Sequence, residues 1–245
     1  MIRSCLDRDQ VLDLRQAYLS LFPQGFCQGN DMRAGRFSGK KPEDLLPGFP
    51  KHGFPGHPAY DFVRTGIFRS FADQPVLKRI ASVILGDDVV RMRRTPLRHF
   101  IKGNSVASRA HLDGSYIACP WEDVVTFWVP LGDCPLEAGA LIYLEDSQMD
   151  AEVDRALKAK APTDRPHDNR PITNDLKWLA DTTGKRWLGC DFHAGDIIAH
   201  TPGMVHASLD CNSDIMRISA DIRFVRRSTK PDPRWTEDWS ADDGY

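Results

Sequence analysis

The stretch AGDIIAHTPGMVHAS, residues 194–208, decides how this chain folds. The apolar residues within 196–200 predict a strand, Thr201-Pro202-Gly203 turns the chain, and His206 emerges on the far side of that turn. Outward from this stretch, runs with period-two alternation predict further strands at 89–93, 98–102, 124–131, 140–144 and 215–224. Many short strands joined by turns are typical of an antiparallel sandwich or barrel.

Helices are expected mainly before these strands. Residues 9–22 carry apolar side chains at helical spacing, and Pro23 ends the helix. A second helix begins at Asp73 as its N-cap and ends at Gly86. A third, short helix is expected at 151–161. This order predicts a mainly β fold, in which N-terminal helices buttress a barrel.

Residues 23–58 are rich in glycine and proline and fit no regular element. A loop of this length inside a compact domain is either functional or disordered. Its aromatic side chains, among them Phe37 and Phe49, argue against disorder, so we expect either a lid over a site or a structural wrap. Four basic side chains of the segment could meet an anionic substrate or form a solvated basic face: Arg33, Arg36, Lys40 and Lys41.

The composition indicates one domain, 1–245, with a polar insert at 147–189. The formal net charge is -2 and the isoelectric point is about 6.4, so there is no global basic field that would favour nucleic acid. We find neither an apolar signal segment nor a run approaching ~18 apolar residues, which predicts no membrane span. The six cysteines form no CxxC pair and are expected to be reduced thiols in a cytoplasmic protein.

His111-Leu112-Asp113 places an imidazole and a carboxylate two residues apart. In an extended strand these two side chains point to the same side, so both can bind one metal ion. A third ligand must come from another strand. Among His193, His200 and His206, we favour His206, because a position just beyond the turn fits the mouth of a barrel. Three further histidines lie in proline-rich loops and are expected to be solvated: His52, His57 and His167.

Two imidazoles and one carboxylate on one face of a metal leave three positions open, as in the facial triad of non-haem Fe(II) oxygenases. Arg217 follows His206 by eleven residues and could hold the far carboxylate of a 2-oxoacid that fills two of these positions. A guanidinium suits this role because it makes paired, charge-assisted hydrogen bonds to a carboxylate. The third position would take O₂.

Three blocks around these residues resemble the phytanoyl-CoA dioxygenase family of Fe(II)/2-oxoglutarate oxygenases. They are HLD at 111–113, TFWVPLGD with LEAGAL at 126–133 and 136–141, and the run from 194 to 208 that continues to Asn212-Ser213 and Arg217-Ile218-Ser219. The resemblance covers about 67–224 and implies a double-stranded β-helix, the jelly-roll barrel of the cupin type. The segment Leu144-Glu145-Asp146-Ser147-Gln148 departs from the family pattern, which leaves the local loop open.

The resemblance also implies roles for single residues. Iron is expected on His111, Asp113 and His206, and 2-oxoglutarate on Arg217 with Ser219 as a hydroxyl partner. Trp128 would lie against the cosubstrate or be a plain core tryptophan. A basic residue upstream of the HLD motif is also expected to contact the cosubstrate, and four remain open: Arg91, Arg93, Arg98 and Lys102.

The activity that the resemblance implies is hydroxylation of a small molecule, such as a secondary metabolite. The reaction would use Fe(II), O₂ and 2-oxoglutarate and release succinate and CO₂. The competing class is a non-oxidative metal-binding cupin, either an isomerase or a ligand-binding protein. Such a protein needs no clamp for a 2-oxoacid, so Arg217 and Ser219 discriminate between the two. The sequence predicts no oligomeric state.

Overall fold

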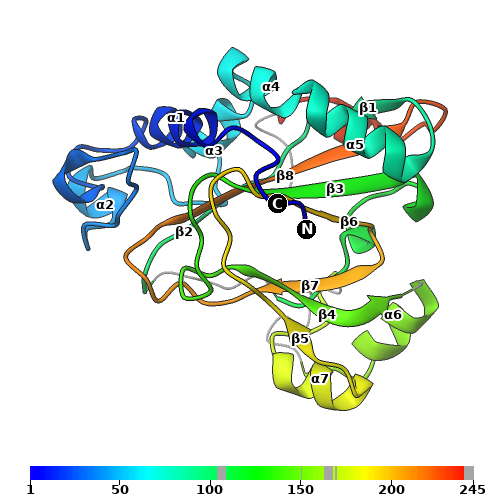
Figure 1. The fold of residues 1–245 in the computed structure, drawn as a ribbon. Coiled ribbons are helices and arrows are strands. Elements are labelled where there is room, and N and C mark those ends of the chain that lie inside the picture. Colours follow the sequence, from blue (N-terminus) through cyan, green and yellow to red (C-terminus); the bar gives the residue numbers. More distant parts are fainter. Residues whose placement is uncertain (104–108, 150, 163–167, 169, 240–245) are drawn as a thin grey trace.

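Two antiparallel sheets form the centre of the molecule in the computed structural model, which describes residues 1–239 except 104–108, 150, 163–167 and 169 (Figure 1). The larger sheet has the order β1-β8-β3-β6, and β2 also pairs with β8. Its strands are β1 (Val89–Arg91), β2 (Leu97–Phe100), β3 (Val124–Pro130), β6 (Ile198–His200) and β8 (Arg217–Arg226). The smaller sheet has the order β5-β4-β7 and consists of β4 (Leu141–Gln148), β5 (Trp187–Leu188) and β7 (Met204–Ser208).

The six predicted strands are confirmed, with shifted ends, as β1, β2, β3, β4, β6 and β8. The sequence did not predict β5 and β7. The prediction of a mainly β fold is wrong in its proportions, because more of the described residues lie in helices than in strands. The chain is a mixed α/β protein built on two antiparallel sheets.

Helices cover the outer face of the larger sheet (Figure 1). They are α1 (Arg8–Leu19), α3 (Pro58–Phe62), α4 (Gly66–Ala72) and α5 (Pro75–Leu85), and their apolar faces join one core cluster with β3 and β8. Asp73 is not the predicted N-cap: Gln74 takes that position, and Asp73 ends α4. The Asp73 carboxylate is instead held by Arg91, whose Nε donates to it at 2.6 Å. The remaining helices are α2 (Pro42–Leu45), α6 (Ala151–Lys158), α7 (Leu176–Thr183), α8 (Pro233–Thr236) and the 3-10 turns Gln28–Asn30, Asp113–Ser115 and Trp121–Asp123.

Strand β8 positions the site because its two faces differ. Ile218, Ala220, Ile222 and Phe224 join the helix-side core. The alternate residues face the other way, toward the space between the sheets, and are polar and buried: Arg217, Ser219, Asp221 and Arg223. Successive side chains of a strand point to opposite faces, so one strand supplies both a core face and a polar face.

The first part of the glycine- and proline-rich segment packs against the rest of the fold. Phe26 and Phe37 are buried, and backbone bridges join Cys27 to Phe37 and Arg36 to Ile215. For the rest of 23–58, the lid stays a prediction. The predicted insert holds α6, α7 and β5, and a bridge from Ala110 to Thr173 fastens it beside the HLD motif. No helix among the described residues has the length and apolarity to cross a membrane.

Candidate metal centre

His111, Asp113 and His206 come together in the space between the sheets. One ligand atom from each lies within 4.8 Å of the others, and all three side chains are buried. Paired backbone hydrogen bonds of 3.0 and 3.1 Å join residue 111 to residue 206, which sets the two imidazoles side by side. Asp113 begins a 3-10 turn, yet Leu112 before it is extended, so His111 and Asp113 still share one side as expected.

The backbone fixes which nitrogen each imidazole offers. Nδ1 of His111 donates to the carbonyl oxygen of Arg109 at 2.6 Å, and Nδ1 of His206 donates to that of Met204 at 3.0 Å. The proton therefore sits on Nδ1, and Nε2 keeps its lone pair. Burial lowers the pKa of both histidines, and the neighbouring imidazoles of His111 and His200 lower the pKa of His206 further. Neutral imidazole with an oriented second nitrogen is the form that binds metals.

Asp113 is held as a carboxylate. Thr126 Oγ1 donates to Oδ2 at 2.7 Å, and Arg223 Nη2 donates to Oδ1 at 2.9 Å. Burial on its own raises the pKa of Asp113, but the Arg223 guanidinium and His200 outweigh it and hold this pKa well below its ordinary value. A negative charge that persists between two neutral imidazoles fits a divalent cation such as Fe(II).

His200 lies beside this group and outside it. It stands opposite Thr126 in the pairing of β6 with β3, and its Nε2 is 3.2 Å from Asp113 Oδ2. Tyr143 contacts its other side, with 2.9 Å between the hydroxyl oxygen and Nδ1. His193, the third competitor from the sequence, has a side chain 69% exposed and lies 3.8 Å from Asp133. The structure thus groups His206 with the HLD motif, sets His200 next to it and leaves His193 at the surface.

Arg217 is buried, and its hydrogen-bond partners among the described residues are a carbonyl and two hydroxyl groups, not a carboxylate. Its Nε donates to Gly139 O at 3.1 Å, Nη1 to Ser219 Oγ at 3.2 Å and Nη2 to Ser208 Oγ at 2.6 Å. Partners among the described residues therefore use three of its five N–H groups and leave two for a ligand. Burial lowers the pKa of Arg217 to about 10, which leaves it charged at neutral pH.

Aromatic rings and one glycine complete the surroundings of this guanidinium. The Phe100 ring centroid is 3.9 Å from Cζ, and that of Trp128 is 5.7 Å away. Gly139 has φ of 85°, and a Cβ there would lie 2.9 Å from the backbone oxygen of Leu209. Only glycine fits this turn without strain, and the turn aims the glycine carbonyl at Arg217. A buried, anchored and unpaired cation is suited to an incoming carboxylate.

Several residues of the site were not predicted from the sequence. Thr126 and Ser208 lie within the blocks that carry the resemblance but were given no role, Tyr143 lies in none of them, and only the fold shows the contacts of these three side chains. Arg223 could have been predicted to face the site, since the alternation of β8 places it on the same face as Arg217. Among the four upstream basic residues, Arg98 lies opposite Ser219 in the pairing of β2 with β8 and contacts Asp221, whereas Arg91 and Lys102 pair with Asp73 and Asp214.

Comparison with known proteins identifies a family and solved structures of similar fold. A sequence model described as phytanoyl-CoA dioxygenase matches residues 2–219. The epimerase SnoN from nogalamycin biosynthesis, solved with Fe3+, alpha ketoglutarate and nogalamycin RO, has a TM-score of 0.62 at 16% identity, over 100% of this chain and 87% of that one. The non-heme alpha ketoglutarate dependent carbocyclase SnoK has a TM-score of 0.52 at 21% identity, and the match covers 68% of this chain and 61% of that one. EctD from S. alaskensis has a TM-score of 0.60 at 14% identity, and the match covers 96% of this chain and 75% of that one.

These identities show a shared fold and no more. A comparison of the sequence with curated proteins returned no match.

Proposed function

Because the chain belongs to the phytanoyl-CoA dioxygenase family, a family of Fe(II)/2-oxoglutarate-dependent oxygenases, we propose that it hydroxylates a small molecule. The observation that carries this is the buried group of His111, Asp113 and His206, together with Arg217, whose charge has no carboxylate partner among the described residues. A metal triad alone would also suit a non-oxidative cupin. A second buried site for a carboxylate has no purpose in such a protein, so it supports the oxygenase.

Each residue has a role in this proposal. Nε2 of His111, Nε2 of His206 and the Asp113 carboxylate hold Fe(II), and Arg223 and Thr126 keep that carboxylate charged and oriented. With 2-oxoglutarate and O₂, the iron supplies oxidation of a substrate C–H bond, with release of succinate and CO₂.

Arg217 holds the far carboxylate of 2-oxoglutarate through its two unused N–H groups, with Ser219 and Ser208 fixing the guanidinium. Trp128 forms part of the wall beside it.

Hydroxylation is the reaction that we favour within this class. The Asp113 carboxylate is present as a third ligand, which supports oxidation of the substrate rather than transfer of a halide. The solved relatives include an epimerase and a carbocyclase from one biosynthetic route, so this fold accommodates several outcomes. Those names also support a secondary metabolite as the substrate here.

The wider organisation follows from the same proposal. We infer that residues 1–245 form one domain and that its two sheets are those of a double-stranded β-helix. The six cysteines form no disulfide, which supports the predicted cytoplasmic location.

Binding of 2-oxoglutarate provides the most direct test. Under argon, calorimetric titration of the Fe(II)-loaded protein should show one site for 2-oxoglutarate, and the Asp113→Ala variant should lose tight iron binding. In air, the loaded wild-type protein should form succinate from 2-oxoglutarate, and the variant should not. A protein that binds iron at the triad and shows no affinity for 2-oxoglutarate would instead be a non-oxidative cupin.

A further inference from the structure

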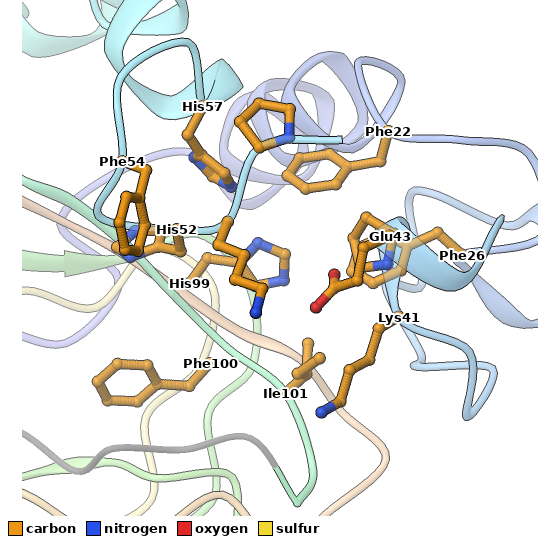
Figure 2. Close-up of a pocket in the computed structure, with 13 residues that line it drawn as sticks. Phe22, Phe26, Lys41, Glu43, His52, Phe54, His57, His99, Phe100 and Ile101 are labelled. Carbon is orange, nitrogen blue, oxygen red and sulfur yellow. The ribbon is translucent and has the colours of Figure 1, made fainter. Parts of the chain in front are cut away.

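His200 differs from the other histidines that the structure describes, because a side chain contacts each of its ring nitrogens. Nε2 lies 3.2 Å from Asp113 Oδ2, and Nδ1 lies 2.9 Å from the Tyr143 hydroxyl oxygen. Three other imidazoles line the cavity of about 340 Å³ shown in Figure 2, and among the described residues none of them has a side-chain hydrogen-bond partner: His52, His57 and His99. His200 is thus connected to the metal centre on one side and to a single hydroxyl group on the other.

Strand pairing sets these side chains against one another. His200 is on β6 of the larger sheet, and Tyr143 is on β4 of the smaller sheet, where it stands opposite His206 on β7. The Tyr143 ring also lies beside that of His206, with centroids 5.8 Å apart and planes 35° apart. The hydrogen bond between Tyr143 and His200 therefore crosses the space between the sheets at the metal centre.

The Asp113 carboxylate fixes the direction of both hydrogen bonds of His200. A carboxylate only accepts, so the nitrogen that faces it must carry a proton. Neutral imidazole has one N–H, so with that proton on Nε2 the lone pair is on Nδ1 and accepts the Tyr143 O–H. Burial raises the pKa of the Tyr143 hydroxyl well above its ordinary value, so the hydroxyl keeps the proton that it donates. Tyr143 therefore donates to His200, and His200 donates to Asp113.

These donors determine which oxygen of Asp113 is open. Oδ2 accepts from Thr126 Oγ1 at 2.7 Å, His200 Nε2 at 3.2 Å and Arg223 Nε at 3.4 Å. Within the described part of the chain, Oδ1 accepts from Arg223 Nη2 alone, at 2.9 Å. A carboxylate oxygen has about two lone-pair sites, so Oδ2 is fully used and Oδ1 keeps one site for a metal ion.

We propose that Tyr143 is a positioning residue for the metal centre, because its hydroxyl selects the His200 tautomer that donates to Asp113 Oδ2. Without the hydroxyl, the proton can move to Nδ1, and the lone pair of Nε2 then faces the negatively charged Oδ2. The carboxylate loses a donor and gains a repulsive neighbour, so it is held less firmly. This inference rests on the proposed function, since it requires a metal ion at the triad.

The tautomer can be measured in the metal-free protein. Long-range ¹H–¹⁵N NMR of protein with ¹⁵N-labelled histidine distinguishes protonated from unprotonated ring nitrogens, and His200→Asn identifies the His200 signals by their loss. Wild-type protein should carry the proton on Nε2 and a lone pair on Nδ1. Tyr143→Phe should carry the proton on Nδ1 in a detectable share of molecules.

Tyr116→Phe is the matched control. Its ring also lies beside a proposed metal-binding imidazole, with 5.5 Å between its centroid and that of His111. Both nitrogens of His200 contact other residues, so loss of the Tyr116 hydroxyl should leave the His200 signals unchanged.

Metal affinity is the second measurement, with Co(II) under argon as the probe and its visible absorption as the signal. Residues that orient a metal ligand typically change affinity about 10- to 100-fold, and Tyr143 acts one residue further away, so Tyr143→Phe should weaken Co(II) roughly two- to tenfold. Tyr116→Phe should change it less than about twofold. In a His200→Ala background, Tyr143→Phe should add no further loss, because the hydroxyl acts through the imidazole.

Three results would overturn the inference: a proton on Nδ1 of His200 in wild type, the wild-type tautomer in Tyr143→Phe, or an undiminished loss of affinity in the His200→Ala background. Melting temperatures show whether each variant is folded. A protein with the expected tautomers that binds no Co(II) would refute the proposed metal centre and this inference with it. An unchanged tautomer in a Tyr143→Phe protein that still binds Co(II) would refute the inference alone.

Discussion

Replacing Arg217 tests the proposed cosubstrate site most directly. In the wild type the guanidinium is anchored by Gly139, Ser208 and Ser219 and keeps two N–H groups for the ligand. Arg217→Ala would leave the far carboxylate of 2-oxoglutarate buried and unpaired. Truncating one partner of a buried charge pair costs about 2–5 kcal/mol. With 1.4 kcal/mol for each factor of ten, the dissociation constant should rise by roughly 30-fold to 4,000-fold.

Calorimetric titration of 2-oxoglutarate into Fe(II)-loaded protein under argon measures this change. Iron affinity, determined separately, should stay within about threefold of wild type, because the triad residues make no hydrogen bond to Arg217. Alanine also removes a large buried side chain, so the melting temperature must be followed. Arg217→Lys is the milder variant: it keeps a positive charge but cannot make the paired contact, and its affinity should lie between wild type and alanine.

Ser219→Ala separates direct from indirect effects. The serine hydroxyl accepts from Nη1 at 3.2 Å, and its loss should weaken 2-oxoglutarate binding by about tenfold or less, since a hydrogen bond to a charged group contributes roughly 1.5–3 kcal/mol and this one acts through the arginine. An unchanged dissociation constant in the folded Arg217→Ala variant would refute the reasoning. The cosubstrate carboxylate would then be held elsewhere, with Arg98 as the next residue to replace.

The remaining predictions concern histidines. His206→Ala should abolish tight iron binding and His193→Ala should not, as measured by equilibrium dialysis and metal analysis; tight binding by the first variant would mean that another residue is the third ligand. His200→Asn removes the imidazole beside Asp113 and should weaken iron binding roughly 10- to 100-fold, the usual loss for a residue that orients a metal ligand, so an unchanged affinity would show that the contact does not matter. For His57, burial lowers the pKa from 6.5 to about 3, so its contribution to stability is complete above its unfolded pKa and is lost as pH falls from about 6.5 to about 3. The His57→Asn variant keeps an N-cap acceptor and removes the titrating imidazole. In urea titrations at about pH 7.5 and about pH 5, its free energy of unfolding should therefore fall less with acid than that of wild type, and an equal fall would contradict this assignment.

Local patterns were enough to predict most of the sheet and much less of its surroundings. Strand β3 is a run of apolar and β-branched residues, and β8 alternates polar with apolar residues from Arg217 to Phe224, so the sequence predicted both strands. Strand β7 was missed because four of its five residues are buried, whichever face of the sheet they point to. The strand therefore lacks the alternation of polar and apolar residues that marks a half-exposed strand. The N-cap at Asp73 was assigned wrongly because a second helix, α4, ends at that residue, and an acidic side chain fits a helix start and an ion pair equally well.

Burial of a histidine was also hard to predict from local sequence. A proline-rich loop is usually solvated, so His57 was expected at the surface. The structure buries it under Phe22 and Phe49, with ring centroids 5.7 and 6.4 Å away, because it begins a short helix that packs against α1. Of the three histidines weighed as the third ligand, His206 is the one whose backbone pairs with that of His111, a contact between distant residues that the local sequence does not show.

Three arginines face the space between the sheets and show what the structure adds to the motif: Arg217 and Arg223 are buried, and Arg98 is partly exposed. A sequence cannot rank them as ligands for an external carboxylate. A buried charge costs several kcal/mol unless it is paired, so each needs a partner. Arg223 finds Asp113 and Arg98 finds Asp221, both within the chain. Arg217 has hydroxyl and carbonyl partners only, and its positive charge is not neutralised by any described carboxylate. Of the three, it alone is left to bind an anion from solution, which is why the proposed cosubstrate site rests on this residue.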